Sequence, residues 1–83
     1  MTAEELTKIV DGIIAGLDKD NFLHQAINWE DLHCFSVRET GDKDRPWLVW
    51  IKEADPEAYA FQIEIEGRLF QKHRIRADVN TEW

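Results

Sequence analysis

Apolar and polar residues alternate between positions 47 and 76, and this alternation constrains the fold more than any other feature of the chain. Most of the large apolar side chains occupy odd positions, whereas Leu48, Trp50 and Phe70 stand at even positions among polar and charged residues; the odd set is Trp47, Val49, Ile51, Tyr59, Phe61, Ile63, Ile65, Leu69 and Ile75. Because successive side chains of a strand point to opposite faces of a sheet, this period of two predicts strands with one buried face. Turn-forming residues around Pro56 and Gly67 divide the block, which predicts strands over 47–54, 59–65 and 69–77.

The N-terminal part of the chain has a helical period instead. Spacings of three and four predict an amphipathic helix over 3–17, with its apolar stripe at Leu6, Ile9, Val10, Ile13, Ile14 and Leu17. Thr2 and Glu5 have the spacing of a capping box, in which each side chain accepts a hydrogen bond from a free backbone N–H group. Residues 21–28 repeat the helical spacing over barely two turns, which leaves a second short helix open, and residues 32–39 are expected to form the first strand.

These elements predict an α+β fold with a single domain over residues 1–83. The N-terminal amphipathic helix, with or without the second short helix, is expected to pack on one face of a four-stranded antiparallel β-meander. A chain of 83 residues is long enough for one thin hydrophobic core. Residues 78–83 are expected to form a tail, and the sequence leaves open whether Trp83 folds back over the exposed aromatic rings.

The register of the last predicted hairpin decides which side chains reach the outer face of the sheet. A two-residue turn at Glu66-Gly67 would bury Phe70 and carry two cations, Lys72 and Arg74, toward the core. A loop one residue longer would turn Phe70 and both cations outward. Because burying two cations costs more free energy than exposing one aromatic ring, the longer loop is the favoured prediction.

With the longer loop, aromatic and cationic side chains gather on the outer face of the predicted sheet. The predicted partner-binding residues are Arg38, Trp50, Phe70, Lys72, Arg74 and Arg76. Exposed aromatic rings beside arginines are typical anchors of protein contacts. The competing interpretation is a solvated face with cross-strand ion pairs to Glu64 and Glu66, which accounts for the charges but less well for two exposed aromatic rings.

Charge is distributed unevenly along the chain. The net charge is −7, which disfavours general binding to phosphate backbones or anionic membranes. Residues 1–66 hold 15 acidic and 6 basic side chains, whereas residues 67–83 hold 2 acidic and 4 basic ones. The chain is therefore an acidic body with one basic segment, 68–76, which contains no acidic residue.

The sequence lacks motifs for catalysis, cofactors or metals. Its four glycines are too scattered for a phosphate-binding loop, and the only serine, Ser36, lies in a predicted strand. The residues His24, His33, Cys34 and His73 match no zinc-ligand spacing. We therefore expect a protein that is not an enzyme and binds neither a cofactor nor a metal ion.

Cysteine content and hydropathy indicate the compartment. The single cysteine, Cys34, cannot form an internal disulfide, which predicts a buried, inert thiol in a protein of the reducing cytoplasm. The acidic N-terminus lacks the basic start of a signal peptide. No apolar run approaches the length of a membrane span, so no membrane contact is expected.

The leading functional hypothesis is a small, acidic, non-catalytic protein-binding module, such as an adaptor, an inhibitor or an immunity-type protein. It would occupy a surface of a larger, basic protein partner. The alternative is single-stranded nucleic-acid binding on the exposed sheet face, through Trp50, Phe70 and the basic segment 68–76, which the net charge disfavours. A homodimer through the same face, or through the helix flank marked by Gly12 and Gly16, is compatible with either function. These two glycines also fit a close crossing of the helix over the sheet.

Overall fold

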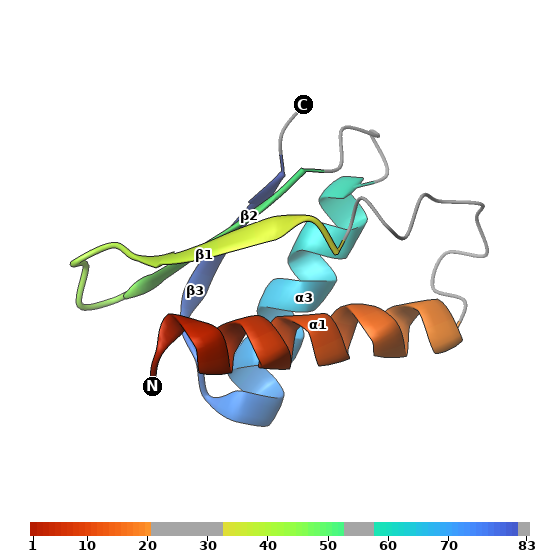
Figure 1. Cartoon of the computed structure of the whole chain (residues 1–83), viewed down its shortest axis with the longest axis horizontal. Coiled ribbons are helices and arrows are strands. Elements are labelled where there is room, and N and C mark those ends of the chain that lie inside the picture. The colour runs from red at the N-terminus through yellow and green to blue at the C-terminus, as the bar shows by residue number, and fades with distance from the viewer. Residues whose placement is uncertain (21–32, 53–57, 82–83) are drawn as a thin grey trace.

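Two helices and three strands make up the part of the chain that the computed structural model describes, residues 1–20, 33–52 and 58–81. In chain order they are α1 (Ala3–Lys19), β1 (Phe35–Glu39), β2 (Trp47–Ile51), α3 (Ala58–His73) and β3 (Ala77–Thr81) (Figure 1). Both helices lie on the same side of the sheet, so the molecule has two layers (Figure 1). The predicted α+β class is confirmed, whereas the four-stranded antiparallel meander is not.

The three strands form a mixed sheet in the order β1-β2-β3. Strand β1 pairs with β2 in antiparallel register, with Val37 opposite Val49, as the first predicted hairpin requires. Strand β2 pairs with β3 in parallel, with Val49 beside Val79. Parallel neighbours need a crossover connection, and α3 provides it.

One hydrophobic core fills the space between the sheet and the two helices. The sheet contributes every second residue of its strands, namely Trp47, Val49 and Ile51 of β2 and Ala77 and Val79 of β3. The helices contribute one stripe each, formed by Leu6, Val10, Ile13, Ile14 and Leu17 of α1 and by Phe61, Ile65 and Leu69 of α3. Because both stripes pack against the same face, the opposite face of the sheet receives no helix from the described residues.

A single helix, α3, replaces the strands that are predicted over 59–65 and 69–77. Gly67, the predicted turn residue, lies in the interior of this helix. The side chains are spaced for a helix as well, since Arg68 Nε donates a hydrogen bond to Glu64 Oε1, four residues earlier, at 2.8 Å. Neither of the two hairpin registers therefore occurs.

The prediction fails at α3 because its core residues fit two periods at once. Phe61, Ile65 and Leu69 are fully buried, and residues four apart share a face in a strand and nearly share a face in a helix. The exposure of Ile63 distinguishes a helix from a strand over these residues. It would be buried with Phe61 and Ile65 in a strand, but it is 53% exposed on α3.

Arg74 ends α3 in the left-handed region, with a φ of 57°. Its N–H group donates to the carbonyl of Phe70 at 3.0 Å, and the N–H group of Ile75 donates to the carbonyl of Leu69 at 3.1 Å. These bonds satisfy two of the carbonyl groups that a helix leaves free at its C-terminal end. The chain turns sharply here, so that Ile75 is buried and β3 begins two residues later.

The segment that is predicted to be a tail, 78–83, contains most of the third strand. Ala77 and Val79 are buried on the inner face of the sheet, while Asp78 and Asn80 are half-buried on the other face. Two small apolar residues carry only a weak period-two signal, which explains why periodicity misses this strand. Its position beside β2 depends on the crossover through α3, which the predicted meander does not contain.

The N-terminal helix is confirmed and extends to Lys19, two residues beyond its predicted end. Its capping box is present. The N–H group of Glu5 donates to Thr2 Oγ1, and the N–H group of Thr2 donates to Glu5 Oε1, each at 3.2 Å.

We expect Thr2→Ala to lower the free energy of unfolding by about 1 kcal/mol, because the first turn of α1 loses its side-chain acceptor. Thr7→Ala is the matched control, since Thr7 lies inside the same helix, where alanine is the better helix former. Urea denaturation followed by circular dichroism measures both variants. Equal losses for Thr2→Ala and Thr7→Ala would contradict the capping role.

Gly12 and Gly16 do not mark a close crossing of α1 over the sheet. Apart from its chain neighbours and the backbone of its own helix, a Cβ atom at Gly12 would have no described atom within 4 Å. One at Gly16 would meet Nη1 of Arg68, a flexible side chain of α3, at 3.7 Å. The interpretation that these glycines let the sheet approach is therefore wrong for the described residues.

Several expectations from the sequence fall outside the described residues. They concern the short helix over 21–28, most of the turn at 55–58, and Trp83. Within the described ranges, neither helix combines the length and the apolar content that crossing a membrane requires.

Candidate functional site

The face of the sheet that points away from the helices carries an exposed tryptophan at its centre. We call this surface the outer face; its residues are Ser36, Arg38, Leu48, Trp50, Asp78 and Asn80. Trp50 lies on the middle strand between Ser36 and Asn80 and is 44% exposed. In the next row, Leu48 lies between Arg38 and Asp78. The outer face is therefore an apolar centre with a polar rim, and no described helix packs on it.

A shallow groove crosses the β1–β2 half of the outer face. It has a volume of about 300 Å³ and is lined by Ser36, Arg38, Leu48 and Trp50. The strand alternation places these side chains together, because the antiparallel register sets Ser36 opposite Trp50 and Arg38 opposite Leu48. Two residues that the sequence predicts for partner binding, Arg38 and Trp50, thus share one groove.

The second exposed aromatic ring, Phe70, lies in the last turns of α3 and is 42% exposed. The guanidinium carbon of Arg74 lies 5.9 Å from the centroid of this ring, and that of Arg76 lies 5.5 Å from it. Both distances are within the range of cation–π attraction. We call these three residues the Phe70 cluster.

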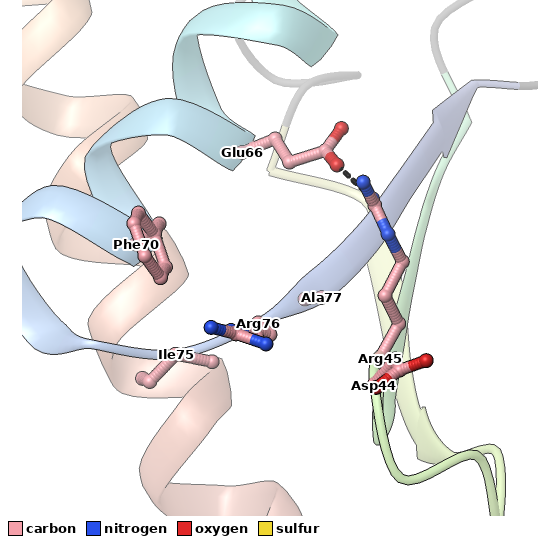
Figure 2. A pocket seen from close by; sticks show the side chains of 7 residues that line it. All are labelled: Asp44, Arg45, Glu66, Phe70, Ile75, Arg76 and Ala77. Carbon is pink, nitrogen blue, oxygen red and sulfur yellow. Dashed lines mark hydrogen bonds and ion pairs between the residues drawn. The ribbon is translucent and has the colours of Figure 1, made fainter.

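A second groove separates α3 from the start of β3 (Figure 2). It has a volume of about 320 Å³ and is lined by Asp44, Arg45, Glu66, Phe70, Ile75, Arg76 and Ala77. Ile75 and Ala77 are buried and form its apolar floor. We call it the α3–β3 groove. Phe70 and Arg76 stand at one end of it, and Asp44 and Arg45 from the β1–β2 loop stand at the other (Figure 2).

Arg45 joins three separate parts of the molecule at the α3–β3 groove. Its Nη1 atom donates to Glu66 Oε1 on α3 and, at 2.9 Å, to Asp78 Oδ1 on β3 (Figure 2 shows the first of these bonds). The hydrogen bond and charge of Glu66, followed by those of Asp78, raise the pKa of the Arg45 guanidinium above its ordinary value. The sequence prediction misses this residue, because Arg45 stands in a predicted turn and Asp78 in a predicted tail.

The structure divides the predicted partner-binding residues between two surfaces. Arg38 and Trp50 lie on the outer face, whereas Phe70, Arg74 and Arg76 form the Phe70 cluster. Lys72 is exposed in the last turn of α3 and contacts no ring or carboxylate of the described residues. The expectation that all six share one sheet face is wrong, because it depends on a strand over 69–77 that does not form.

The residues considered as metal ligands are dispersed in the described part of the chain. No three histidine, cysteine or acidic side chains gather there in a group that could hold a metal ion. His33 Nδ1 lies 3.0 Å from Asp11 Oδ1, and this pair links the start of β1 to α1. Cys34 is exposed, so the prediction of a buried thiol is wrong.

Known proteins do not identify either surface. A scan against protein-family models finds no match, and comparisons with curated proteins and with solved structures find none either.

Proposed function

We propose that this protein is a small, acidic, non-catalytic binding module whose outer face docks on a larger, basic protein. The observation that carries the proposal is the position of Trp50. It stands at the centre of three strands, 44% exposed, with no described element packed over it. An exposed tryptophan surrounded by polar groups has the composition of an interaction site, since tryptophan is among the residues that most often dominate binding energy.

The rim of the outer face supports the same function. Arg38 and Asp78 flank Leu48, so the face carries one charge of each sign around an apolar centre. Protein interfaces combine a water-excluded core with a polar, solvent-accessible rim in this way. A typical interface involves about 20–30 residues on each side, so the partner would also contact the loops and edges around the outer face.

Net charge supports a basic partner. At −7 for 83 residues, the protein attracts cationic surfaces at long range and repels anionic ones. The outer face itself is nearly neutral, so charge would speed the encounter while Trp50 contributes to the lifetime of the complex. The association rate should therefore fall as the salt concentration rises.

Single-stranded nucleic-acid binding has less support than protein binding. It requires Trp50 and Phe70 on one platform with the cations of the basic segment, but these rings line two different grooves. The outer face carries a single arginine and an aspartate, which offers little attraction for a phosphate backbone. A titration of tryptophan fluorescence with a mixed oligonucleotide at low salt tests this alternative directly.

The proposed function is tested by substitution of Trp50. The tagged protein is used to capture partners from a native extract, the captured protein is identified and purified, and its affinity is measured by calorimetry. Trp50→Ala is expected to weaken binding by at least about tenfold, because it removes the central anchor. Ile63→Ala is the matched control, since Ile63 is an apolar residue of similar exposure, 53%, on α3 in the other layer.

Comparison of the two variants distinguishes binding at a specific site from nonspecific hydrophobic binding. Equal weakening by Trp50→Ala and Ile63→Ala would contradict docking through the outer face. Sedimentation of the protein alone distinguishes a homodimer, because a second copy on the same face would double the mass and Trp50→Ala would restore the monomer.

A further inference from the structure

Three of the five arginines of this acidic protein, Arg38, Arg74 and Arg76, have no carboxylate partner among the described residues. The ion pairs of the described chain engage Arg45 with Glu66 and Asp78, and Arg68 with Glu64 and Asp20. The guanidinium groups of Arg74 and Arg76 lie over the ring of Phe70 and form no ion pair with a described residue. A ring satisfies none of the five N–H donors of a guanidinium group. Both groups therefore keep their hydrogen-bond donors available, Arg76 in the lining of the α3–β3 groove and Arg74 beside the Phe70 ring.

The end of α3 places both guanidinium groups beside one aromatic ring. Arg74 is fixed in the left-handed region by the bonds that end α3, and Arg76 follows two residues later, next to the first residue of β3. Phe70 lies one helical turn before Arg74 and serves as the surface against which both side chains pack. Two cations of like charge are thus brought to one ring, an arrangement that a bound anion would stabilise.

We infer that the Phe70 cluster and the α3–β3 groove bind a small phosphate-bearing ligand. The phosphate group would bind Arg76, which lines the groove, with Arg74 beside the same ring as the second cation, because planar guanidinium groups match the geometry of phosphate oxygens. The apolar part of the ligand would lie on the floor formed by Ile75 and Ala77. A volume of about 320 Å³ is at the lower end of the range for small-molecule sites, which fits a ligand of mononucleotide size.

The opposite end of the groove limits the length of the ligand. Asp44 and Glu66 stand there, and their carboxylates would repel further phosphate groups (Figure 2). Arg45 offsets part of this negative charge by pairing with Glu66. The groove therefore favours one phosphate group at its cationic end and disfavours a continuous polynucleotide.

A nuclear magnetic resonance titration of the full chain tests the inference. The probes are inorganic phosphate, adenosine monophosphate and adenosine, added to ¹⁵N-labelled protein. We expect saturable shifts of the amides of Phe70, Ile75 and Ala77 and of the Nε–Hε groups of Arg74 and Arg76. Adenosine monophosphate should bind several-fold more tightly than inorganic phosphate because it also uses the apolar floor, and adenosine should cause no comparable shift.

Matched substitutions separate a built site from general attraction to positive charge. Arg74→Gln and Arg76→Gln should each weaken the affinity for adenosine monophosphate by about tenfold, the loss of one charge-assisted hydrogen bond. Arg38→Gln removes the same charge from the outer face and should leave this affinity unchanged. Thermal unfolding confirms that each variant is folded.

Three outcomes would overturn the inference. These are no saturable shift, equal weakening by Arg38→Gln and Arg76→Gln, and shifts centred on the indole of Trp50. Tighter binding of a short oligonucleotide than of adenosine monophosphate would also exclude a small ligand. Failure here leaves the proposed protein-binding function intact, since that function rests on Trp50 and is read out by partner capture.

Discussion

Replacement of Phe61 by alanine is expected to lower the free energy of unfolding by about 3–5 kcal/mol. Phe61 is 0% exposed and is the largest of the fully buried side chains. Its removal takes an aromatic ring out of the core between α3 and the sheet and leaves a cavity that close-packed neighbours fill only partly. A domain of this length has about 4–12 kcal/mol of stability in total, so the variant loses a large part of it.

Ile63→Ala is the control that distinguishes a helix from a strand over these residues. Ile63 lies two residues along the same helix and is exposed, so its replacement should change the free energy of unfolding by less than about 0.5 kcal/mol. In a strand, both residues would point to the same buried face and both substitutions would be costly. Urea denaturation followed by circular dichroism measures the two losses, and similar values would contradict the helix.

Gly67→Ala is expected to raise the free energy of unfolding by about 0.5–1 kcal/mol, whereas Gly67→Pro should lower it by about 3 kcal/mol or more. Gly67 lies inside α3, and apart from its chain neighbours and the backbone of its own helix, a Cβ atom there would meet no described atom within 4 Å. Alanine therefore gains helix propensity without a clash. Proline removes a backbone N–H donor and forces its ring against the preceding turn of the helix.

Gly41→Ala is expected to lower the free energy of unfolding, the opposite of the effect expected for Gly67→Ala. Gly41 has a φ of 80°, a left-handed conformation that an alanine side chain destabilises, so this variant should lose about 1 kcal/mol. Thermal or urea unfolding of the two alanine variants side by side compares a helical glycine with a loop glycine. A loss of stability in Gly67→Ala would contradict the position of this residue in α3.

The sequence predicts the elements whose residues fit one period only. In α1, for example, apolar residues at spacings of three and four match no strand pattern. In α3, by contrast, Phe61, Ile65 and Leu69 satisfy both periods, and the β-branched residues Ile63 and Ile65 favour a strand by local propensity. The helix forms nevertheless, because the core needs a second apolar stripe over the sheet and β3 needs a crossover.

The sequence predicts the exposure of individual residues of the candidate site, but it does not predict how these residues are arranged in space. The exposure of Trp50 and Phe70 is confirmed, while their common face is not. Periodicity assigns a face within an element, and it cannot relate residues of different elements when one of those elements is misassigned. The contact of Arg45 with Glu66 and Asp78 shows the same limit, since it joins a loop, a helix and a strand that are far apart in sequence.

Arg45 also has a consequence for the motion of the β1–β2 loop. Thr40 and Asp42 bond within this loop, and every described hydrogen bond or ion pair that ties it to α3 or β3 passes through Arg45. An exposed ion pair weakens as salt screens it, while the buried stripes of the core do not depend on ionic strength in this way. We therefore expect rising ionic strength to loosen the contact of this loop with α3 while the sheet and both helices stay folded, which would open the mouth of the α3–β3 groove by a local motion.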